Sequence, residues 1–182
     1  MLSPVFNFEY DFNKQKLLDE YHKRVEKGLG YRYLAGENYE DREVVEEDAN
    51  YSKTTLVRIK NGYAHSVAKE FVEWIGGEEF ICHYLGYGKE DFVEWHVDKR
   101  PEEYCKNASR VNVFLTGKSY TTFRDKDHWY EQAVVNVMGE EHKYDNRGQG
   151  ERVMFQIAIK GISHNELCEK LLQKSTIEWL RH

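Results

Sequence analysis

The stretch EFICHYLGYG, Glu79 to Gly88, followed by DFVEWHVD, Asp91 to Asp98, decides the fold. Upstream of it apolar residues recur at helical spacing, whereas from Glu79 onward they alternate with a period of two. Three further alternating segments follow: SRVNVFLTG, QAVVNVMG and ERVMFQIAIKG, at 109–117, 132–139 and 151–161. Short segments rich in β-branched and aromatic residues, separated by turn residues, predict an antiparallel barrel or sandwich.

Helical segments flank this run of strands. Asn13–Lys27 and Tyr63–Trp74 carry apolar residues at helical spacing, so we expect two amphipathic helices that cover the outside of one sheet. After Gly161 the pattern SHNELCEKLLQKSTIEWL predicts a closing helix. The predicted fold class is therefore α+β, mainly β, with helices outside a barrel.

The length of 182 residues suits one domain with a substantial core. We expect a helical N-terminal part at 1–78, a β core at 79–161 and a C-terminal helix at 162–182. Regions of the chain expected to carry substrate specificity are the loops Gly36–Asn50 and Lys118–Tyr130.

Composition narrows the class of protein. Hydrophobic residues make up 40% and the formal net charge is -6, which favours a globular protein and argues against a nucleic-acid-binding surface. The 3 cysteines lie far apart without a Cys-x-x-Cys, which favours reduced thiols over a disulfide framework. The N-terminus shows no signal-peptide pattern, and no stretch is apolar enough to span a membrane. We expect a cytoplasmic protein with no membrane partner; the sequence does not indicate its oligomeric state.

His96 and Asp98 are the first candidate metal ligands. In a strand they point to the same side, so an imidazole nitrogen and a carboxylate oxygen can reach one ion. Such a spacing also arises by chance in a chain of this composition, and a structural role stays open. A second pair, His164 and Glu166, is explained without a metal, because Ser163 and Glu166 form a capping box at the start of the last helix.

A third ligand is expected on a later strand. A facial Fe(II) site needs two histidines and one carboxylate, and GEEHKYDN offers His142. The turn-forming stretch RGQG then predicts a hairpin whose returning strand begins at Glu151 and Arg152. Across this hairpin Arg152 would lie near His142.

Arg152 heads a strand that otherwise reads as buried. It shares one face with Met154 and Gln156, while the aliphatic and aromatic residues form the other face. A buried guanidinium requires an anionic partner, which a dicarboxylic cosubstrate would supply in bidentate fashion. The alternative partner is internal, for which the candidates are Glu140, Glu141 and Asp145.

Together these residues resemble the Fe(II)/2-oxoglutarate-dependent dioxygenase superfamily. The pattern, which extends over about residues 80–160, consists of His96-x-Asp98, His142, Asn146 and Arg152. Within the superfamily, Arg110-x-Asn112 is similar to the aspartyl/asparaginyl β-hydroxylase-like and proline hydroxylase-like branch. That branch usually has Arg-x-His at this point, so Asn112 is a departure.

The resemblance implies a double-stranded β-helix, a jelly-roll or cupin-like barrel of two facing antiparallel sheets. It implies Fe(II) held by the metal ligands His96, Asp98 and His142, with 2-oxoglutarate and O₂ as cosubstrates. Arg152 would receive the distal carboxylate of 2-oxoglutarate, and further cosubstrate contacts would come from Tyr84, Arg110 and Asn112. The implied reaction is hydroxylation of an amino-acid or protein side chain or of another small metabolite.

Other functions remain open at this point. One is a binding or structural barrel that has lost catalysis, whose signature would be a missing ligand or a missing anion clamp. Another is a nucleic-acid demethylase of the same superfamily, although Arg147 and Arg152 are not at the paired-arginine spacing of that branch. A cupin-type dioxygenase or a zinc hydrolase would favour several histidines in one short motif, which this sequence lacks.

Overall fold

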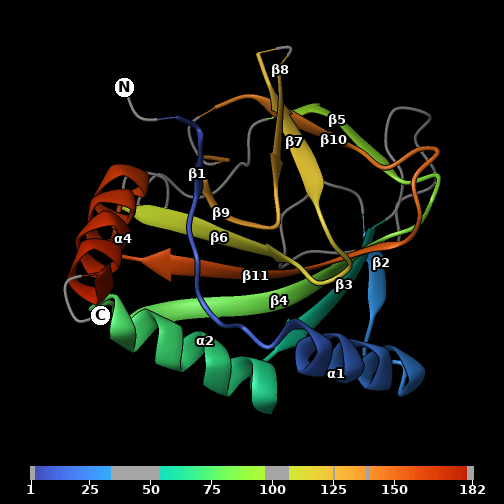
Figure 1. Ribbon diagram of the computed structural model, residues 1–182. Helices are drawn as coiled ribbons and strands as arrows, with labels where there is room; N and C mark the ends of the chain where they lie inside the picture. The colour runs from blue at the N-terminus through green and yellow to red at the C-terminus, as the bar shows by residue number, and fades with distance from the viewer. Residues whose placement is uncertain (1–2, 34–53, 97–106, 125, 138–139, 180–182) are drawn as a thin grey trace.

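The computed structural model describes residues 3–33, 54–96, 107–124, 126–137 and 140–179. Within these residues two antiparallel sheets face each other, and helices lie outside the larger one (Figure 1). The larger sheet contains, in spatial order, β1 (Val5–Asn7), β9 (Gln132–Val135), β6 (Ala108–Phe114), β11 (Arg152–Lys160), β4 (Glu79–Tyr87), β3 (Thr54–Ile59) and β2 (Tyr31–Tyr33). The smaller sheet contains β5 (Phe92–His96), β10 (His142–Asp145), β7 (Ser119–Phe123) and β8 (Lys126–Tyr130).

The central strand β11 shows why the sheet has two unlike faces. It pairs with β4 on one side and β6 on the other, so its alternating side chains define both faces of the larger sheet. Its odd-numbered residues, including Phe155 and Ile157, join the core beneath the helices. Met154 belongs instead to the cluster between the two sheets. The predicted division of this strand into two faces is confirmed.

Two helices cover the outer face of the larger sheet, as predicted. Helix α1 (Lys14–Glu26) begins after Asn13, whose side chain accepts a hydrogen bond from the Lys16 N–H. Helix α2 (Tyr63–Trp74) follows the strand β3 and lies beside α1 along the sheet (Figure 1). Together they bury an apolar layer against the sheet: Leu17 and Tyr21 from α1, and Ala64, Val67, Ala68, Phe71 and Val72 from α2.

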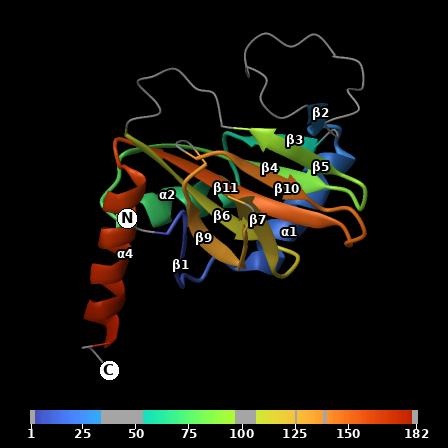
Figure 2. The same ribbon diagram turned by 90° about the horizontal axis from the view of Figure 1, so that it is seen from above.

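The approach of α1 to the sheet depends on a glycine. A Cβ atom built on Gly86, in β4, would overlap the Tyr21 hydroxyl of α1. Because only glycine leaves this space, the helix can rest directly on the strand. The third helix, α4 (His164–Trp179), closes one end of the larger sheet, where it contacts β6 and β9 (Figure 2). One of the two hydrogen bonds of its predicted capping box is present, since Ser163 Oγ accepts from the Glu166 N–H at 3.4 Å.

The space between the sheets forms the barrel interior. An apolar cluster fills part of it, with contributions from both sheets: Leu56, Leu85, Tyr87, Val93, Phe114, Phe123, Tyr130, Tyr144 and Met154 among others. Two facing antiparallel sheets with this strand order and outer helices form the predicted double-stranded β-helix.

Three sequence-based expectations differ from the structure. The segment Lys118–Tyr130, expected as a loop, contains the paired strands β7 and β8, with Arg124 at φ 47 in the turn between them. The polar runs Tyr-Thr-Thr and Lys-Asp-His are typical of a loop, but here they belong to a strand pair whose outer face is exposed to solvent. The expected hairpin between β10 and β11 is also wrong, because β10 pairs with β5 and β7 in the other sheet. Finally, the N-terminal part, expected as helices that pack on the sheet, also supplies the short strands β1 and β2 to it.

The described helices and cysteines add two smaller findings. No helix in the part of the chain that the structure describes is long and apolar enough to cross a membrane. Cys82 and Cys168 are buried free thiols, and burial raises the pKa of each to about 12. Cys105 and the expected specificity loop Gly36–Asn50 lie outside the described residues.

Candidate metal and cosubstrate site

The structure brings His96 and His142 together on the inner face of the smaller sheet. The two residues are register partners in the β5–β10 pair, and their ring centroids lie 4.3 Å apart. A bulge in β5 separates this pair from the next, Val93 with Tyr144. The extra residue in β5 reverses which of its side chains point inward, so that Val93 and His96, three residues apart, both lie on the inner face with Tyr144 and His142. His142 is buried and His96 half-buried.

Backbone carbonyls fix both imidazole rings. His96 Nδ1 lies 2.7 Å from the Glu94 carbonyl oxygen, and His142 Nδ1 lies 3.0 Å from that of Glu140. A carbonyl can only accept, so Nδ1 is the protonated nitrogen of each ring and the metal-binding lone pair is on Nε2. Anchoring of the far nitrogen in this way is typical of histidines that bind metals.

The third predicted ligand, Asp98, lies outside the described residues. Among the described residues no group of three or more His, Cys, Asp or Glu side chains is arranged to hold a metal ion. The donor set that can be tested is therefore the histidine pair, and its tautomers and orientation suit a divalent cation such as Fe(II). Asp98 remains a predicted ligand two residues beyond His96.

Arg152 is the first residue of β11. The turn that leads to it leaves β10 at the end opposite His142. Its register partner on β4 is Tyr87, whose ring packs at a tilt against that of Tyr144, with centroids 4.2 Å apart. Burial raises the pKa of the Tyr144 hydroxyl above its ordinary value, and the positive charge of Arg152 offsets only part of this rise. Tyr144 is two residues from His142 on the same face of β10, so it lies between the histidine pair and the arginine.

The Arg152 guanidinium makes few hydrogen bonds. Its Nε atom is buried without a hydrogen-bond partner, and Nη1 is 3.5 Å from the Glu151 carbonyl oxygen. Two of the carboxylates considered as internal partners are bound elsewhere: Asp145 pairs with Arg147 at 2.6 Å, and Glu140 with Arg124 at 3.2 Å. The third candidate, Glu141, is exposed. A half-buried cation with an unsatisfied nitrogen is the arrangement that an external carboxylate would complete.

Arg110 and Asn112 also point into the barrel, where they belong to a buried polar chain. Arg110 Nη1 donates to Gln156 Oε1 at 2.9 Å, and Gln156 Nε2 donates to Asn112 Oδ1 at 2.8 Å. The chain continues from Asn112 Nδ2 to the Tyr130 hydroxyl at 3.2 Å, which bonds Thr121 Oγ1 at 2.9 Å. It therefore links strands of both sheets across the interior.

Two further details of this chain bear on the predicted site. Both ends of the Asn112 amide are used within it, and the contacts of Arg110 and Asn112 with the cosubstrate stay predictions. Near its end at Thr121, Phe123 lies two residues along β7 and packs its ring against His142, with the two ring centroids 5.6 Å apart.

Tyr84 does not face this site, which corrects the sequence-based prediction. Its ring packs against Tyr21 of α1 at 5.6 Å and against Phe155 at 5.5 Å, within the core beneath the helices. The residues of β4 that face the interior include His83, Leu85 and Tyr87, whose register partners on β11 are Gln156, Met154 and Arg152. The signal that could have found them is Gly86, since a glycine on the Tyr84 face marks the side that a helix approaches.

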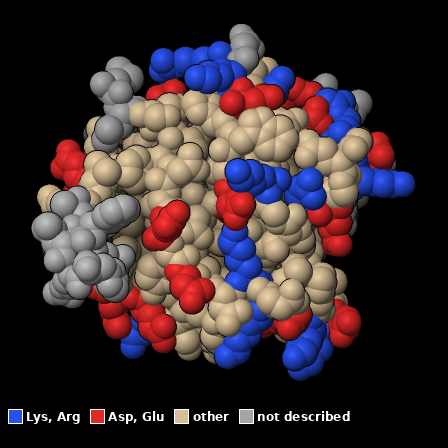
Figure 3. Space-filling model, viewed as in Figure 1, with Lys and Arg blue, Asp and Glu red and all other residues tan. Residues whose placement is uncertain are grey.

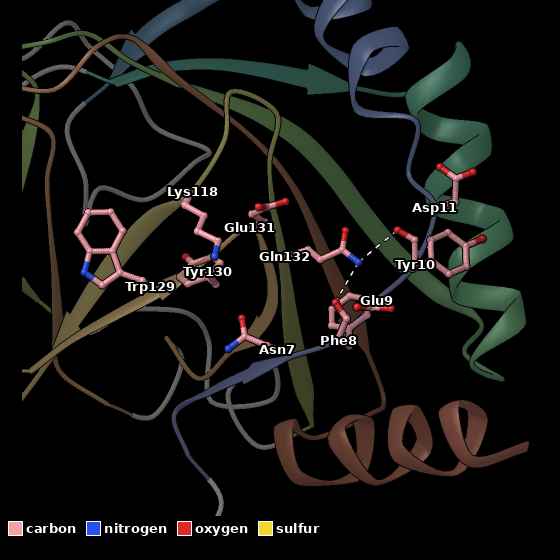
Figure 4. Close-up of a pocket in the computed structure, with 10 residues that line it drawn as sticks. All are labelled: Asn7, Phe8, Glu9, Tyr10, Asp11, Lys118, Trp129, Tyr130, Glu131 and Gln132. Carbon is pink, nitrogen blue, oxygen red and sulfur yellow. Dashed lines mark hydrogen bonds between the residues drawn. The ribbon is translucent and has the colours of Figure 1, made fainter. Parts of the chain in front are cut away.

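A separate open groove lies between the N-terminal segment and the β8–β9 corner (Figure 4). It has a volume of about 810 Å³, with Lys118 and Trp129 at one end and Tyr10 and Asp11 at the other. Gln132 Nε2 closes its floor by donating to the carbonyl oxygens of Phe8 at 3.0 Å and Tyr10 at 3.2 Å. None of the predicted site residues lines this groove, so it is distinct from the histidine pair.

Comparison with known proteins identifies the fold. Three solved structures with this architecture are a Pseudomonas putida prolyl-4-hydroxylase (15% identical, TM-score 0.54, covering 87% of this chain and 91% of that one), a Trichoplax adhaerens prolyl hydroxylase in complex with a hypoxia-inducible-factor peptide fragment (11%, 0.59, 86% and 82%), and a viral collagen prolyl hydroxylase from Paramecium bursaria Chlorella virus-1 in complex with 2-oxoglutarate (10%, 0.54, 87% and 94%).

These matches extend over most of this chain and of each known structure. No family model matches the sequence, and no curated protein matches it. At such low identity the likeness defines the class of fold alone: the chain is a double-stranded β-helix protein with the architecture of prolyl hydroxylases.

Proposed function

We propose that this protein is an Fe(II)- and 2-oxoglutarate-dependent oxygenase that hydroxylates an amino-acid or protein side chain or another small metabolite. The observation that carries the proposal is the cross-strand histidine pair, His96 and His142, with ring centroids 4.3 Å apart and both Nδ1 atoms anchored to carbonyl oxygens. A pair of histidines used only for packing would not need both rings held in the tautomer that directs Nε2 to a metal.

Each residue has a stated role in this proposal. His96, His142 and the predicted ligand Asp98 hold the metal on one side, and Arg152 receives the distal carboxylate of 2-oxoglutarate. Bound there, Fe(II) with 2-oxoglutarate and O₂ would supply the oxidation of an unactivated C–H bond, with the keto acid converted to succinate and CO₂. Tyr144 and Tyr130 are neutral hydroxyl groups in the barrel wall, and burial raises the pKa of each above its ordinary value.

The fold supports a hydroxylase over the other candidate functions. One structural neighbour is a prolyl hydroxylase with a peptide bound and another carries 2-oxoglutarate, which favours a peptide or amino-acid substrate here. Nucleic-acid demethylation is disfavoured by Arg147, which is exposed and held by Asp145 on the outer face, away from Arg152. On the face shown in Figure 3, acidic and basic side chains are interspersed, without the basic stripe that nucleic acid would require.

The decisive experiment measures metal and keto-acid binding directly. Apoprotein titrated anaerobically with Fe(II) and then 2-oxoglutarate should develop the weak visible charge-transfer band of a chelated keto acid. His96→Ala and His142→Ala should each abolish stoichiometric metal binding and leave the circular dichroism spectrum unchanged. Metal content that survives either substitution would remove these residues as ligands.

A second arm tests the anion clamp. With a redox-inert metal in place, Arg152→Met should bind 2-oxoglutarate about 100-fold more weakly, as expected for the loss of ~3 kcal/mol of charge-assisted hydrogen bonding. Arg147→Met is the matched control, because Arg147 is engaged with Asp145 outside the barrel. Equal affinity for 2-oxoglutarate in wild type and Arg152→Met would favour the catalytically inactive binding protein.

A further inference from the structure

Two turns lie side by side at the end of the barrel where Arg152 is found (Figure 1). One joins β4 to β5 around Gly88–Asp91, and the other joins β10 to β11 around Asn146–Gly150. Backbone hydrogen bonds tie them together: the Asn146 N–H donates to Asp91 O at 2.9 Å, and the Gly148 N–H donates to Lys89 O at 3.1 Å. Both turns carry the chain from one sheet to the other, so their contact fixes how the sheets meet at this end.

The side chain of Asn146 joins these two turns from within. It is fully buried, at 0% exposure. Its Nδ2 atom donates to Gly88 O at 2.7 Å and to Gly150 O at 3.0 Å, and its Oδ1 accepts from the Tyr144 hydroxyl at 3.4 Å. One amide therefore engages both turns and the tyrosine that lies between the histidine pair and Arg152.

These contacts surround the backbone of Arg152. Gly150 precedes it by two residues, and Gly88 follows Tyr87, its register partner on β4. The arginine side chain does little to fix its own position, since its Nε atom has no hydrogen-bond partner and its Nη1 contact to Glu151 O is 3.5 Å long. The direction in which the guanidinium enters the barrel is therefore set by the backbone on either side of it.

We propose that Asn146 is a positioning residue for the anion site of Arg152. It acts by holding the two turns in register, so that the guanidinium meets the distal carboxylate of the keto acid without a search over conformations. The inference rests on the proposed function. It goes beyond that function by assigning a role to an asparagine that touches neither metal nor cosubstrate.

The test compares two keto acids on protein loaded with Mn(II) under anaerobic conditions. 2-Oxoglutarate carries the distal carboxylate, whereas 2-oxobutyrate has the same metal-chelating head without it. Isothermal titration should show that Asn146→Ala lowers the affinity for 2-oxoglutarate about 10-fold, a coupling typical of residues in one hydrogen-bond network. The affinity for 2-oxobutyrate should not change. In an Arg152→Met background, Asn146→Ala should cause no further loss. Gln149→Ala, in the same turn, is the matched control and should match wild type.

Each result decides the inference. Equal weakening of both keto acids by Asn146→Ala, or a loss that adds to that of Arg152→Met, would make Asn146 a general structural residue and overturn its positioning role. Wild type that binds both keto acids equally would overturn the anion site itself, and the inference with it. Because Asn146→Ala removes a side-chain donor from Gly88 O, which still accepts from the Asp91 N–H, and from Gly150 O, Asn146→Ser, which keeps one donor, is measured in parallel. Asn146→Ser should also lose affinity for 2-oxoglutarate and not for 2-oxobutyrate, to a smaller extent. A ratio of the two affinities equal to that of wild type would also overturn the proposal.

Discussion

The two faces of the larger sheet are built from the same strands but obey different rules. Beneath the helices the buried layer is almost wholly apolar, with Phe71, Phe155 and Ile157 at its centre. On the barrel side the same strands bury Arg110, Asn112 and Gln156 in a polar chain. Burying such groups costs free energy unless each is paired, so a sheet selected for stability alone would not place them there. On the proposed function, the helix side holds the fold together and the barrel side serves a ligand.

The largest expected effect lies on the helix side. Phe155→Ala should lower the free energy of unfolding by about 3–5 kcal/mol, because it leaves a cavity where the ring packs against Tyr84 and Phe12. Denaturant unfolding monitored by tryptophan fluorescence measures this loss. Metal stoichiometry of the folded fraction should not change, and a loss of metal binding in the folded variant would show that the two faces are not separate.

The next effect lies within the polar chain on the barrel side. Gln156→Met keeps the volume of the side chain but removes both the acceptor of Arg110 and the donor of Asn112. It should lower the free energy of unfolding by about 2 kcal/mol, since buried polar groups lose their partners. Gln149→Met in an outer turn is the control. A cost below ~0.5 kcal/mol would mean that the chain contributes nothing to the barrel.

A smaller effect of opposite sign is expected for Tyr84→Phe. The Tyr84 hydroxyl is buried without a hydrogen-bond partner, so its removal should raise the free energy of unfolding by up to about 1 kcal/mol. Binding of 2-oxoglutarate should stay the same, because the ring faces the helices. Weaker cosubstrate binding in this variant would restore Tyr84 to the site and contradict its assignment to the helix side.

The smallest effect on stability is expected for Arg152→Met. A residue kept for a ligand contributes little to folding, and the unfolding free energy should change by no more than about 0.5 kcal/mol. Thermal unfolding without ligand, compared with wild type, measures it. A loss of several kcal/mol would indicate an internal salt bridge and would weaken the division between a folding face and a binding face.

Much of this architecture can be predicted from the sequence, because a strand or helix with one apolar face shows alternation or helical spacing of its apolar residues. Helix Tyr63–Trp74 was predicted with the bounds that the structure gives it, and α1 differs from its prediction by one residue at each end. The strand pair β7–β8 was missed because its outward residues are polar and aromatic. The placement of Tyr84 was wrong because both faces of β4 are buried, so periodicity cannot distinguish them.

The site was predictable only in part. The spacing of His96 and the later strand of His142 led to a pair that the structure places side by side, although the bulge that aligns them left no signal in the sequence. The expected hairpin was wrong because a turn such as RGQG does not reveal whether the chain returns to the same sheet or crosses to the other. Tyr87 and the buried amide of Gln156 were visible as residues but not as neighbours, since their contacts join strands distant in sequence.

The outermost strand β1 has a consequence for how the molecule is made. Val5 pairs with Val135, so the first strand of the chain completes an edge of the larger sheet beside one of its last strands. On a ribosome the segment around Val5 emerges early and must wait until β9 has followed. Until then β1 lacks its partner, a state in which unpaired strands invite association with other chains. Such a long-range pairing also slows folding. The docking of β1 onto β9 is therefore expected to come late in folding.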